Sequence, residues 1–272
     1  MGVILGLDVG SSTSKIVVMS RDRQILSAQQ VTAGEQLTAL FGAVGQVLYK
    51  SGRELQDVDA LALTGVGGSF LKGDVLGIPT VRVSEMDAMG KGGLFLSGFE
   101  NALICSMGTG TTYVVAGPDG VRHIGGIALG GGTLTGLSAR LFGTKDYSVI
   151  LQMAQKGDLT NVDKLMSEIS LDQVSNLPDY ATASNLGKMK KSASDEDVAI
   201  GLFNMICQAA GTMAVFAARI IDTKDVVVTG SLASADLSRL FLGQVGELYD
   251  IRFHIHEHCA FATAVGAAMH AF

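Results

Sequence analysis

The chain opens with the stretch Val3-Ile4-Leu5-Gly6-Leu7-Asp8-Val9-Gly10-Ser11-Ser12-Thr13-Ser14-Lys15-Ile16-Val17-Val18. An apolar run ends at Asp8, a Gly/Ser/Thr turn follows, and a second apolar run begins after Lys15. This pattern predicts a β-hairpin whose turn offers backbone N–H groups and hydroxyls to an anion. We interpret residues 10–13 as a phosphate cradle with Lys15 as a nearby cation, and Asp8 as a Mg²⁺ ligand, because hard cations prefer oxygen. An ordinary hairpin with a polar turn is the alternative at this point.

The same pattern recurs roughly a hundred residues later, which indicates an internal duplication. Residues 102–107 form an apolar run, residues 108–112 a second Gly/Thr turn, and residues 113–116 the return run. Because strands alternate with helical periodicity elsewhere, the expected class is α/β. The duplication predicts two similar lobes that face each other across a cleft. We expect an N-terminal lobe over residues 1–100 and a C-terminal lobe over residues 101–272.

The remaining elements follow from apolar periodicity and glycine punctuation. Expected strands cover residues 58–63, 78–83, 225–229 and 251–256. Expected helices cover residues 37–48, 90–96, 134–141, 198–221 and 261–269. Residues 147–191 are expected to form a largely helical peripheral insertion.

Phosphoryl transfer requires a phosphate cradle, a metal anchor, a nucleotide pocket and a base that orients the acceptor. Thr109 brings a hydroxyl from the second turn, and residues 130–133 open a helix whose N–H groups can receive phosphate. The turn Thr229-Gly230-Ser231 allows close approach of adenosine to the backbone. Glu85 follows an expected strand, and its carboxylate is our candidate for the base.

Composition excludes several classes of function. Apolar residues make up 47% and charged residues 17% of the 272, which indicates a compact globular protein. A net charge of −6 without a basic block predicts neither a nucleic-acid partner nor a membrane surface. Cys105, Cys207 and Cys259 cannot all pair, and no signal-peptide pattern opens the sequence, so we expect a cytoplasmic protein.

Ordered motifs along nearly the whole chain resemble those of the type II pantothenate kinases, in the acetate and sugar kinase, Hsp70 and actin superfamily. They are Asp8-x-Gly-Ser-Ser-Thr-x-Lys15, Glu85-x-Asp87-Ala88, Gly108-Thr-Gly-Thr111, Gly125-Gly-x-x-x-Gly-Gly-Gly132-Thr and Ala260-Phe261-x-x-Ala-Val-Gly266.

The resemblance implies a duplicated actin-like (ribonuclease H-like) fold with ATP between two lobes. It implies transfer of the γ-phosphoryl of ATP, with Mg²⁺, to the primary hydroxyl of pantothenate, the first step towards coenzyme A. Glu85 matches the family's catalytic base. The helix at residues 198–221 matches its homodimer interface, and acyl-CoA is a family feedback ligand. The residues that match ATP-contacting positions are Asp8, Gly10, Ser11, Ser12, Thr13, Lys15, Thr109, Gly131, Gly132, Thr133, Leu134, Thr135, Tyr147 and Ser231.

The sequence departs from this family at two places. The first loop is usually Gly-Gly-Thr, whereas this chain has Ser11 and Ser12, which would be strained where φ must be positive. The Arg expected before the third glycine motif, a contact for the pantothenate carboxylate, is replaced by His123, preceded by Arg122. Imidazole cannot bind a carboxylate with two parallel hydrogen bonds. We place Arg122 and His123 on the acceptor side and leave open whether the acceptor is pantothenate or a close pantoyl analogue.

Two alternatives from other classes remain. Activators of 2-hydroxyacyl-CoA dehydratases have a similar Asp-Val-Gly-Ser opening, but they hold an iron–sulfur cluster through cysteine-glycine segments, which we do not find around Cys105, Cys207 or Cys259. A non-catalytic regulator that binds a nucleotide or acyl-CoA is the second alternative.

A histidine cluster near the end of the chain is a further candidate site. His254, His256 and His258 alternate, so that a strand would place three imidazoles on one face, where they could bind a transition metal. The spacing lacks an established zinc pattern, and we favour a polar strand face.

Overall fold

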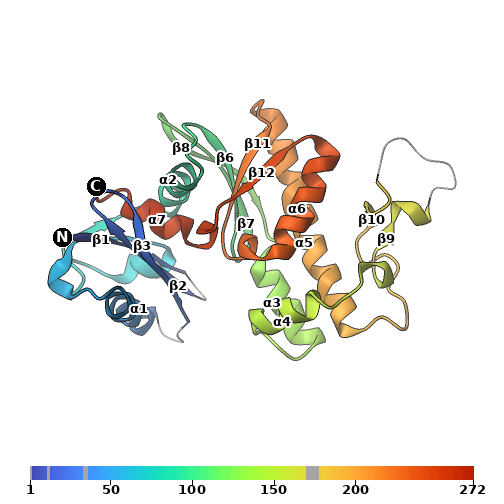
Figure 1. Ribbon diagram of the computed structural model, residues 1–272, viewed down its shortest axis with the longest axis horizontal. Coiled ribbons are helices and arrows are strands. Elements are labelled where there is room, and N and C mark those ends of the chain that lie inside the picture. The colour runs from blue at the N-terminus through green and yellow to red at the C-terminus, as the bar shows by residue number, and fades with distance from the viewer. Residues whose placement is uncertain (1, 11–12, 33–35, 170–177) are drawn as a thin grey trace.

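The computed structural model describes residues 2–10, 13–32, 36–169 and 178–272, which contain two five-stranded sheets of the same design (Figure 1). The first sheet has the order β3 (Ile25–Val31), β2 (Ser14–Ser20), β1 (Val3–Val9), β4 (Val58–Thr64), β5 (Thr80–Arg82). The second has the order β8 (Gly120–Ile127), β7 (Thr111–Gly117), β6 (Ala102–Met107), β11 (Asp225–Thr229), β12 (Arg252–Ile255). In each, an antiparallel meander of three strands is followed by two strands parallel to the first. The predicted duplicated α/β fold is confirmed.

One long helix packs on each sheet at the same point of the repeat. Helix α1 (Gln36–Ser51) lies between β3 and β4 in the chain and packs on β2 and β3. Helix α5 (Asp195–Ile220) lies between β8 and β11 and packs on β6, β7 and β11, with α6 (Asp236–Tyr249) beside it. Because each helix buries an apolar stripe on its sheet, each half has its own hydrophobic core.

The last helix of each half packs on the sheet of the other half. Helix α2 (Glu85–Ser97) follows β5 but lies on β6, β7 and β8, whereas α7 (Ala262–Ala268) follows β12 but lies on β1, β2 and β4. The two helices cross between the sheets, as Figure 1 shows. A Cβ on Gly266 would lie 1.7 Å from the carbonyl oxygen of Ala88, and one on Gly92 would lie 1.8 Å from that of Ala262. The crossing is therefore a contact of backbone on backbone.

The insertion in the second half differs from the expectation. The helix predicted over residues 134–141 is present as α3 and begins three residues earlier (Gly131–Leu141), but residues 147–191 are not largely helical. Beyond α4 (Tyr147–Ala154) the described part consists of turns, two short 3-10 helices (Leu159–Asn161 and Met166–Glu168) and a small hairpin of β9 (Lys164–Leu165) and β10 (Thr182–Ser184). Residues 170–177 lie outside the described residues.

Buried carboxylates hold this insertion on α5 and explain the difference. Asp163 is fully buried and accepts hydrogen bonds from the backbone N–H of Leu186 (2.8 Å) and the side-chain amide of Asn204 (2.7 Å). Asp197 on α5 accepts a hydrogen bond from the N–H of Asp158 (2.7 Å). Side-chain bonds of this kind compete with helical ones and fix irregular backbone, which apolar periodicity does not reveal.

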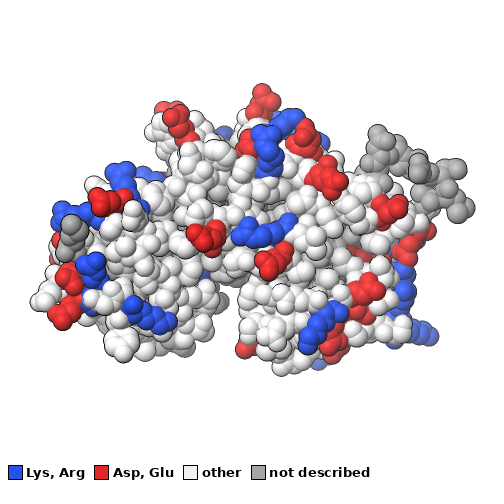
Figure 2. Space-filling model, in the orientation of Figure 1, with Lys and Arg blue, Asp and Glu red and all other residues white. Residues whose placement is uncertain are grey.

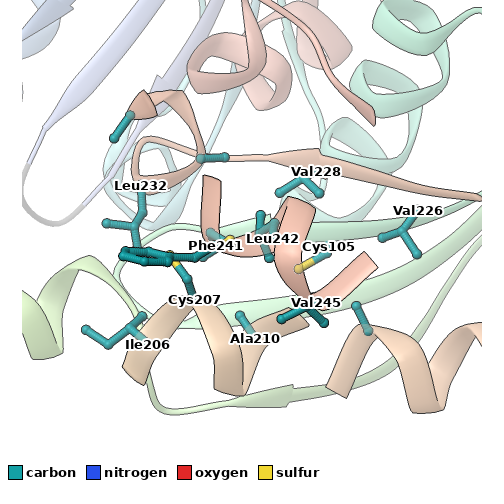
Figure 3. Packing of buried hydrophobic residues seen from close by; sticks show 14 of the residues in the cluster. Cys105, Ile206, Cys207, Ala210, Val226, Val228, Leu232, Phe241, Leu242 and Val245 are labelled. Atoms are coloured by element: carbon teal, nitrogen blue, oxygen red, sulfur yellow. The ribbon is translucent and has the colours of Figure 1, made fainter. Parts of the chain in front are cut away.

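The core of the second half contains all three cysteines as free thiols. Figure 3 shows Cys105 and Cys207 among Ile206, Phe241 and Leu242, and all five side chains are buried. Cysteine serves here as a small apolar residue. Helix α5 is long and apolar enough to cross a membrane by length and composition, but its apolar face builds this core.

The three histidines do not share one strand face, so that expectation was wrong. Strand β12 ends at Ile255, and His256 and His258 follow it, with their rings edge to face at 5.6 Å. His254 instead bonds through Nε2 to Asp225 at 2.7 Å. Within the described residues, no group of three or more His, Cys, Asp or Glu side chains is placed to hold a metal ion.

The helix crossing gives the first test. Gly266→Ala should lower the free energy of unfolding by about 1–3 kcal/mol, because its Cβ must separate α2 from α7. Gly243→Ala on α6 is the matched control, since a Cβ there meets nothing within 4 Å. It should raise stability by about 0.5–1 kcal/mol through reduced freedom of the unfolded chain. Urea unfolding of both variants measures the difference, and equal effects would contradict the crossing.

Candidate active site

Three polar side chains form a row across the end of the first sheet. Asp8 on β1 lies opposite Lys15 on β2 and beside Thr64 on β4. Side chains alternate along a strand, so Asp8 shares a face with Gly6, whose Cβ would lie 2.0 Å from the carbonyl oxygen of Ala264 on α7. The side chains of Lys15, Asp8 and Thr64 therefore lie on the face of the first sheet that packs on α7. We call this the inner face.

Burial and neighbouring charges perturb this row. Burial raises the pKa of Asp8 to about 6, although Lys15 acts in the opposite direction, and the nearby Glu85 carboxylate raises it further. Burial likewise lowers the pKa of Lys15, against the effects of Asp8, Cys259 and Glu85. Glu85 and Cys259 therefore interact electrostatically with this row. Perturbed charges gathered at one point are typical of functional sites.

The first turn is tight where the structure describes it. The N–H of Gly10 donates to the carbonyl oxygen of Thr13 at 3.1 Å, and a Cβ on Gly10 would lie 2.8 Å from that oxygen. Glycine is therefore required at the start of the turn. Ser11 and Ser12 lie outside the described residues.

Glu85 is the first residue of α2, and the adjacent residues fix its position. Ser84 caps the helix, since its Oγ accepts a hydrogen bond from the N–H of Asp87 (3.1 Å) and its hydroxyl donates to the Asp87 carboxylate (2.6 Å). The Glu85 side chain is exposed and so is accessible to a ligand. The cap therefore fixes the start of the helix, where Glu85 lies.

The second sheet carries an equivalent row. Ser106 on β6 pairs with Thr112 on β7 and lies beside Thr229 on β11. Ser106 shares a face with Ile104, whose Cδ1 would lie 2.5 Å from a Cβ on Gly93 of α2. This row, too, emerges on the inner face. The two rows differ in chemistry, because the second carries hydroxyls where the first carries Asp8 and Lys15.

Both rows approach Cys259, just before α7. The N–H of Gly230, which follows Thr229, donates to the carbonyl oxygen of Cys259 at 2.9 Å, and Cys259 interacts electrostatically with Lys15. Figure 2 shows the surface hollowed between the part that contains α1 and the part that contains α3 and α4.

The second turn and the start of α3 form one hydrogen-bonded unit. The N–H of Gly131 donates to the carbonyl oxygen of Gly108 (2.8 Å), and that of Gly132 donates to Thr109 (2.9 Å). These two N–H groups, which we expected to receive phosphate, thus support the second turn. The hydroxyls of Thr133 and Thr135 donate to backbone carbonyls, and the side chain of Leu134 is in the core.

Two further positions matched to ATP contacts lie near these turns. Ser231 follows Gly230, which has φ +98° and whose Cβ would lie 2.3 Å from the carbonyl oxygen of Met107. Tyr147 begins α4, and its buried hydroxyl has no hydrogen-bond partner among the described residues. Burial raises its pKa.

Arg122 and His123 lie on opposite faces of β8. Arg122 pairs with Val115, in the core beneath α5, whereas His123 pairs with Val114, in the cluster beneath α2. Both residues line a pocket of about 370 Å³ at this edge of the sheet, with Met213 on α5. Of the two, His123 is on the same face as the helix that begins at Glu85.

Sequence reasoning singled out the turn at Thr229-Gly230 but missed that Thr64-Gly65 is its counterpart in the first half. Thr64-Gly65 and Thr229-Gly230 occupy the same place in the two halves, with φ +86° at Gly65 and +98° at Gly230. Both threonine hydroxyls are buried and have no partner among the described residues. The repeated Thr-Gly after a buried apolar strand was the signal that could have identified them.

The chemistry of these groups fits a magnesium–nucleotide complex. Asp8 offers carboxylate oxygens to a hard cation, and Lys15 and the two turns offer positive charge and N–H groups to phosphates. The unpartnered hydroxyls of Thr64, Thr229 and Tyr147 are buried groups that a polar ligand would satisfy.

The raised pKa of Asp8 gives a test by pH. Because the folded protein retains a proton at Asp8 up to about pH 6, compared with 3.8 ordinarily, stability should fall as pH rises through this interval. Asp8→Asn removes this effect. Without divalent cations, the free energy of unfolding of Asp8→Asn relative to the wild type should therefore increase between about pH 4 and pH 7, by up to about 3 kcal/mol. Parallel pH profiles from chemical unfolding would contradict the assignment.

Comparison with known proteins identifies the family. The family model Fumble matches residues 101–270. The chain is 28% identical over 273 residues to a type II pantothenate kinase of Staphylococcus aureus (strain USA300), with 97% of each chain covered. The activator of the 2-hydroxyisocaproyl-CoA dehydratase from Clostridium difficile with bound ADPNP has a TM-score of 0.70 at 18% identity, covering 99% of this chain and 94% of that one. A ROK family glucokinase from Streptomyces griseus in complex with glucose and AMPPNP has a TM-score of 0.61 at 13% identity, covering 98% of each.

The structural likenesses, at these identities, show the fold alone, which is the actin-like fold expected from the sequence. The family match covers more than half of the chain, and so this protein belongs to the Fumble family, that of the type II pantothenate kinases.

Proposed function

We propose that this protein is a kinase that transfers the γ-phosphoryl group of ATP to the primary hydroxyl of pantothenate or a close pantoyl analogue. The observation that carries the proposal is that Glu85 follows β5, a strand of the sheet that carries Asp8 and Lys15, and interacts electrostatically with this pair. This arrangement combines a base, a metal anchor and two phosphate cradles. The family membership supports the same reaction.

Each residue has a defined task in this reaction. Glu85 hydrogen-bonds the acceptor hydroxyl and takes its proton as the oxygen attacks the γ-phosphorus, and ADP leaves. Asp8 holds Mg²⁺, which neutralises phosphate charge when bound, and Lys15 adds a positive charge. When the polar rows of the two sheets close around the bound substrates, they exclude water. Water would otherwise compete as the acceptor.

ATP lies between the turns in this proposal. The proposed contacts are those matched from the sequence: Gly10, Ser11, Ser12, Thr13, Thr109, Gly131, Gly132, Thr133, Leu134, Thr135, Tyr147 and Ser231. At Gly131 and Gly132 we expect ATP to lie close against the backbone. Their N–H groups already donate hydrogen bonds to the second turn.

On the acceptor side, His123 is the better placed of the two candidates, because it shares the α2 face with Glu85. Arg122 on the opposite face would reach only a ligand in the pocket beside α5. A single imidazole gives a weaker contact with a carboxylate than a guanidinium does. Pantoyl compounds without a free carboxylate are therefore candidate acceptors beside pantothenate.

The proposal extends to assembly and location. Met213, Phe216 and Ile220 on α5 expose 41%, 50% and 83% of their surface, and they would be covered in a homodimer formed through this helix. We place the protein in the cytoplasm, with acyl-CoA as a feedback ligand, and keep the lobe boundary near residue 100 as a prediction.

The reaction is tested by ADP release with pantothenate, pantetheine and related alcohols. Turnover should depend on a pantoyl acceptor, and Glu85→Gln should lower kcat on the order of a hundredfold or more while ATP still binds. Glu100→Gln, an exposed glutamate beyond α2, is the matched control. Full activity of Glu85→Gln would exclude it as the base, and no turnover with any pantoyl compound would refute the substrate class.

His123→Arg tests the acceptor. If the native acceptor lacks a carboxylate, the variant should gain activity with pantothenate relative to pantetheine, because guanidinium pairs with a carboxylate. An unchanged ratio of kcat/KM for the two compounds would remove His123 from the acceptor site.

A further inference from the structure

Thr64 is buried in a way that the proposed reaction does not yet explain. It is the last residue of β4, it is 2% exposed, and its hydroxyl has no hydrogen-bond partner among the described residues. A buried hydroxyl without a partner lowers the stability of the folded protein. Valine has the same shape and no hydroxyl to bury. The presence of threonine at this position therefore calls for an explanation.

The neighbours of Thr64 connect it to both proposed reaction groups. Asp8 lies next to it across the β1–β4 pairing, and the side chains of paired residues share a face. On the other side, the N–H of Val83 donates to the carbonyl oxygen of Leu63 at 2.9 Å, and Glu85 follows two residues later. Thr64 thus lies between the metal anchor and the segment that delivers the base.

The Asp8 carboxylate lies directly over the backbone that follows Thr64. A Cβ on Gly65 would be 2.7 Å from Oδ1 of Asp8 and 2.6 Å from the carbonyl oxygen of Val9. Glycine at φ +86° leaves the room for the carboxylate. The structure therefore gathers a carboxylate oxygen and an unpartnered hydroxyl oxygen at one place.

The equivalent threonine in the second half has a different neighbour. Thr229 is also buried without a partner, but its cross-strand neighbour is Ser106 instead of a carboxylate. Burial without a partner among the described residues is therefore common to both threonines, and the adjacent carboxylate is specific to Thr64. A role with a cation follows from that carboxylate and applies to Thr64.

We propose that Thr64 is a positioning residue for the hydrated divalent cation held by Asp8, with its Oγ1 accepting a hydrogen bond from a water molecule on that cation. Mg²⁺ held through one carboxylate retains several water molecules, and these need acceptors in a buried site. The hydroxyl would fix the orientation of the hydrated cation relative to Asp8 and Glu85. This inference rests on the proposed function for the cation's presence, and it can be tested without the acceptor.

The test measures cation binding directly. Mn²⁺ is titrated into the protein with AMPPNP, and free Mn²⁺ is followed by electron paramagnetic resonance. Thr64→Val should raise the Kd of Mn²⁺ roughly three- to tenfold, the value of one hydrogen bond, and Thr64→Ser should restore binding. Thr64→Ala, which also lacks the hydroxyl, should match Thr64→Val.

Stability and a control complete the design. Without ligands, Thr64→Val should melt at the same temperature as the wild type or higher, because it removes an unpartnered buried hydroxyl. Ser138→Ala on α3 removes another buried, unpartnered hydroxyl, and it should leave the Kd of Mn²⁺ unchanged.

Equal Mn²⁺ affinity in the wild type and Thr64→Val, or equal weakening in Thr64→Ser, would overturn the proposal. So would the absence of nucleotide-dependent Mn²⁺ binding in the wild type. If Mn²⁺ binding responds to Thr64 as expected but no pantoyl alcohol is phosphorylated, the proposed function fails while this inference stands. The reverse result would remove Thr64 and leave the kinase in place.

Discussion

The structure depends on the contact of α2 with α7, where the backbones touch at Gly92 and Gly266. Each helix ends one half of the chain and packs on the sheet of the other half, so this crossing joins the two halves. It also sets the site, because Glu85 begins α2, and Cys259, close to Lys15, lies just before α7. Larger residues at the crossing would shift the start of α2, and with it Glu85, relative to Asp8.

The duplication provides two equivalent walls, and the sequence makes them chemically different. Asp8 and Lys15 occupy the positions that Ser106 and Thr112 occupy in the second sheet. Charge on one wall and hydroxyls on the other suit a ligand that carries a metal ion at one side and phosphate oxygens at both. Burial disfavours the charged forms of Asp8 and Lys15. The burial therefore lowers stability, which is typical of residues kept for function and not for structure.

The sequence predicted the elements whose pattern is local. The two hairpins, the long helix α5 and the strand before Glu85 all follow from apolar runs and glycine turns. It did not predict the exchange of α2 and α7, since periodicity shows that a helix has an apolar face but not which sheet covers it. The region after α4 depends on buried carboxylates such as Asp163, and the place of Thr64 emerges only when the halves are superposed by strand order. The exchange of the two helices, the region after α4 and the surroundings of Thr64 all depend on contacts between residues distant in sequence.

The most direct test of the account is a crystal structure of the protein with AMPPNP and Mg²⁺. We predict the triphosphate between the turn at residues 10–13 and the turn at residues 108–111, with Mg²⁺ beside Asp8 and Glu85 facing the γ-phosphate. A nucleotide bound away from either turn, or Mg²⁺ held without Asp8, would contradict the account.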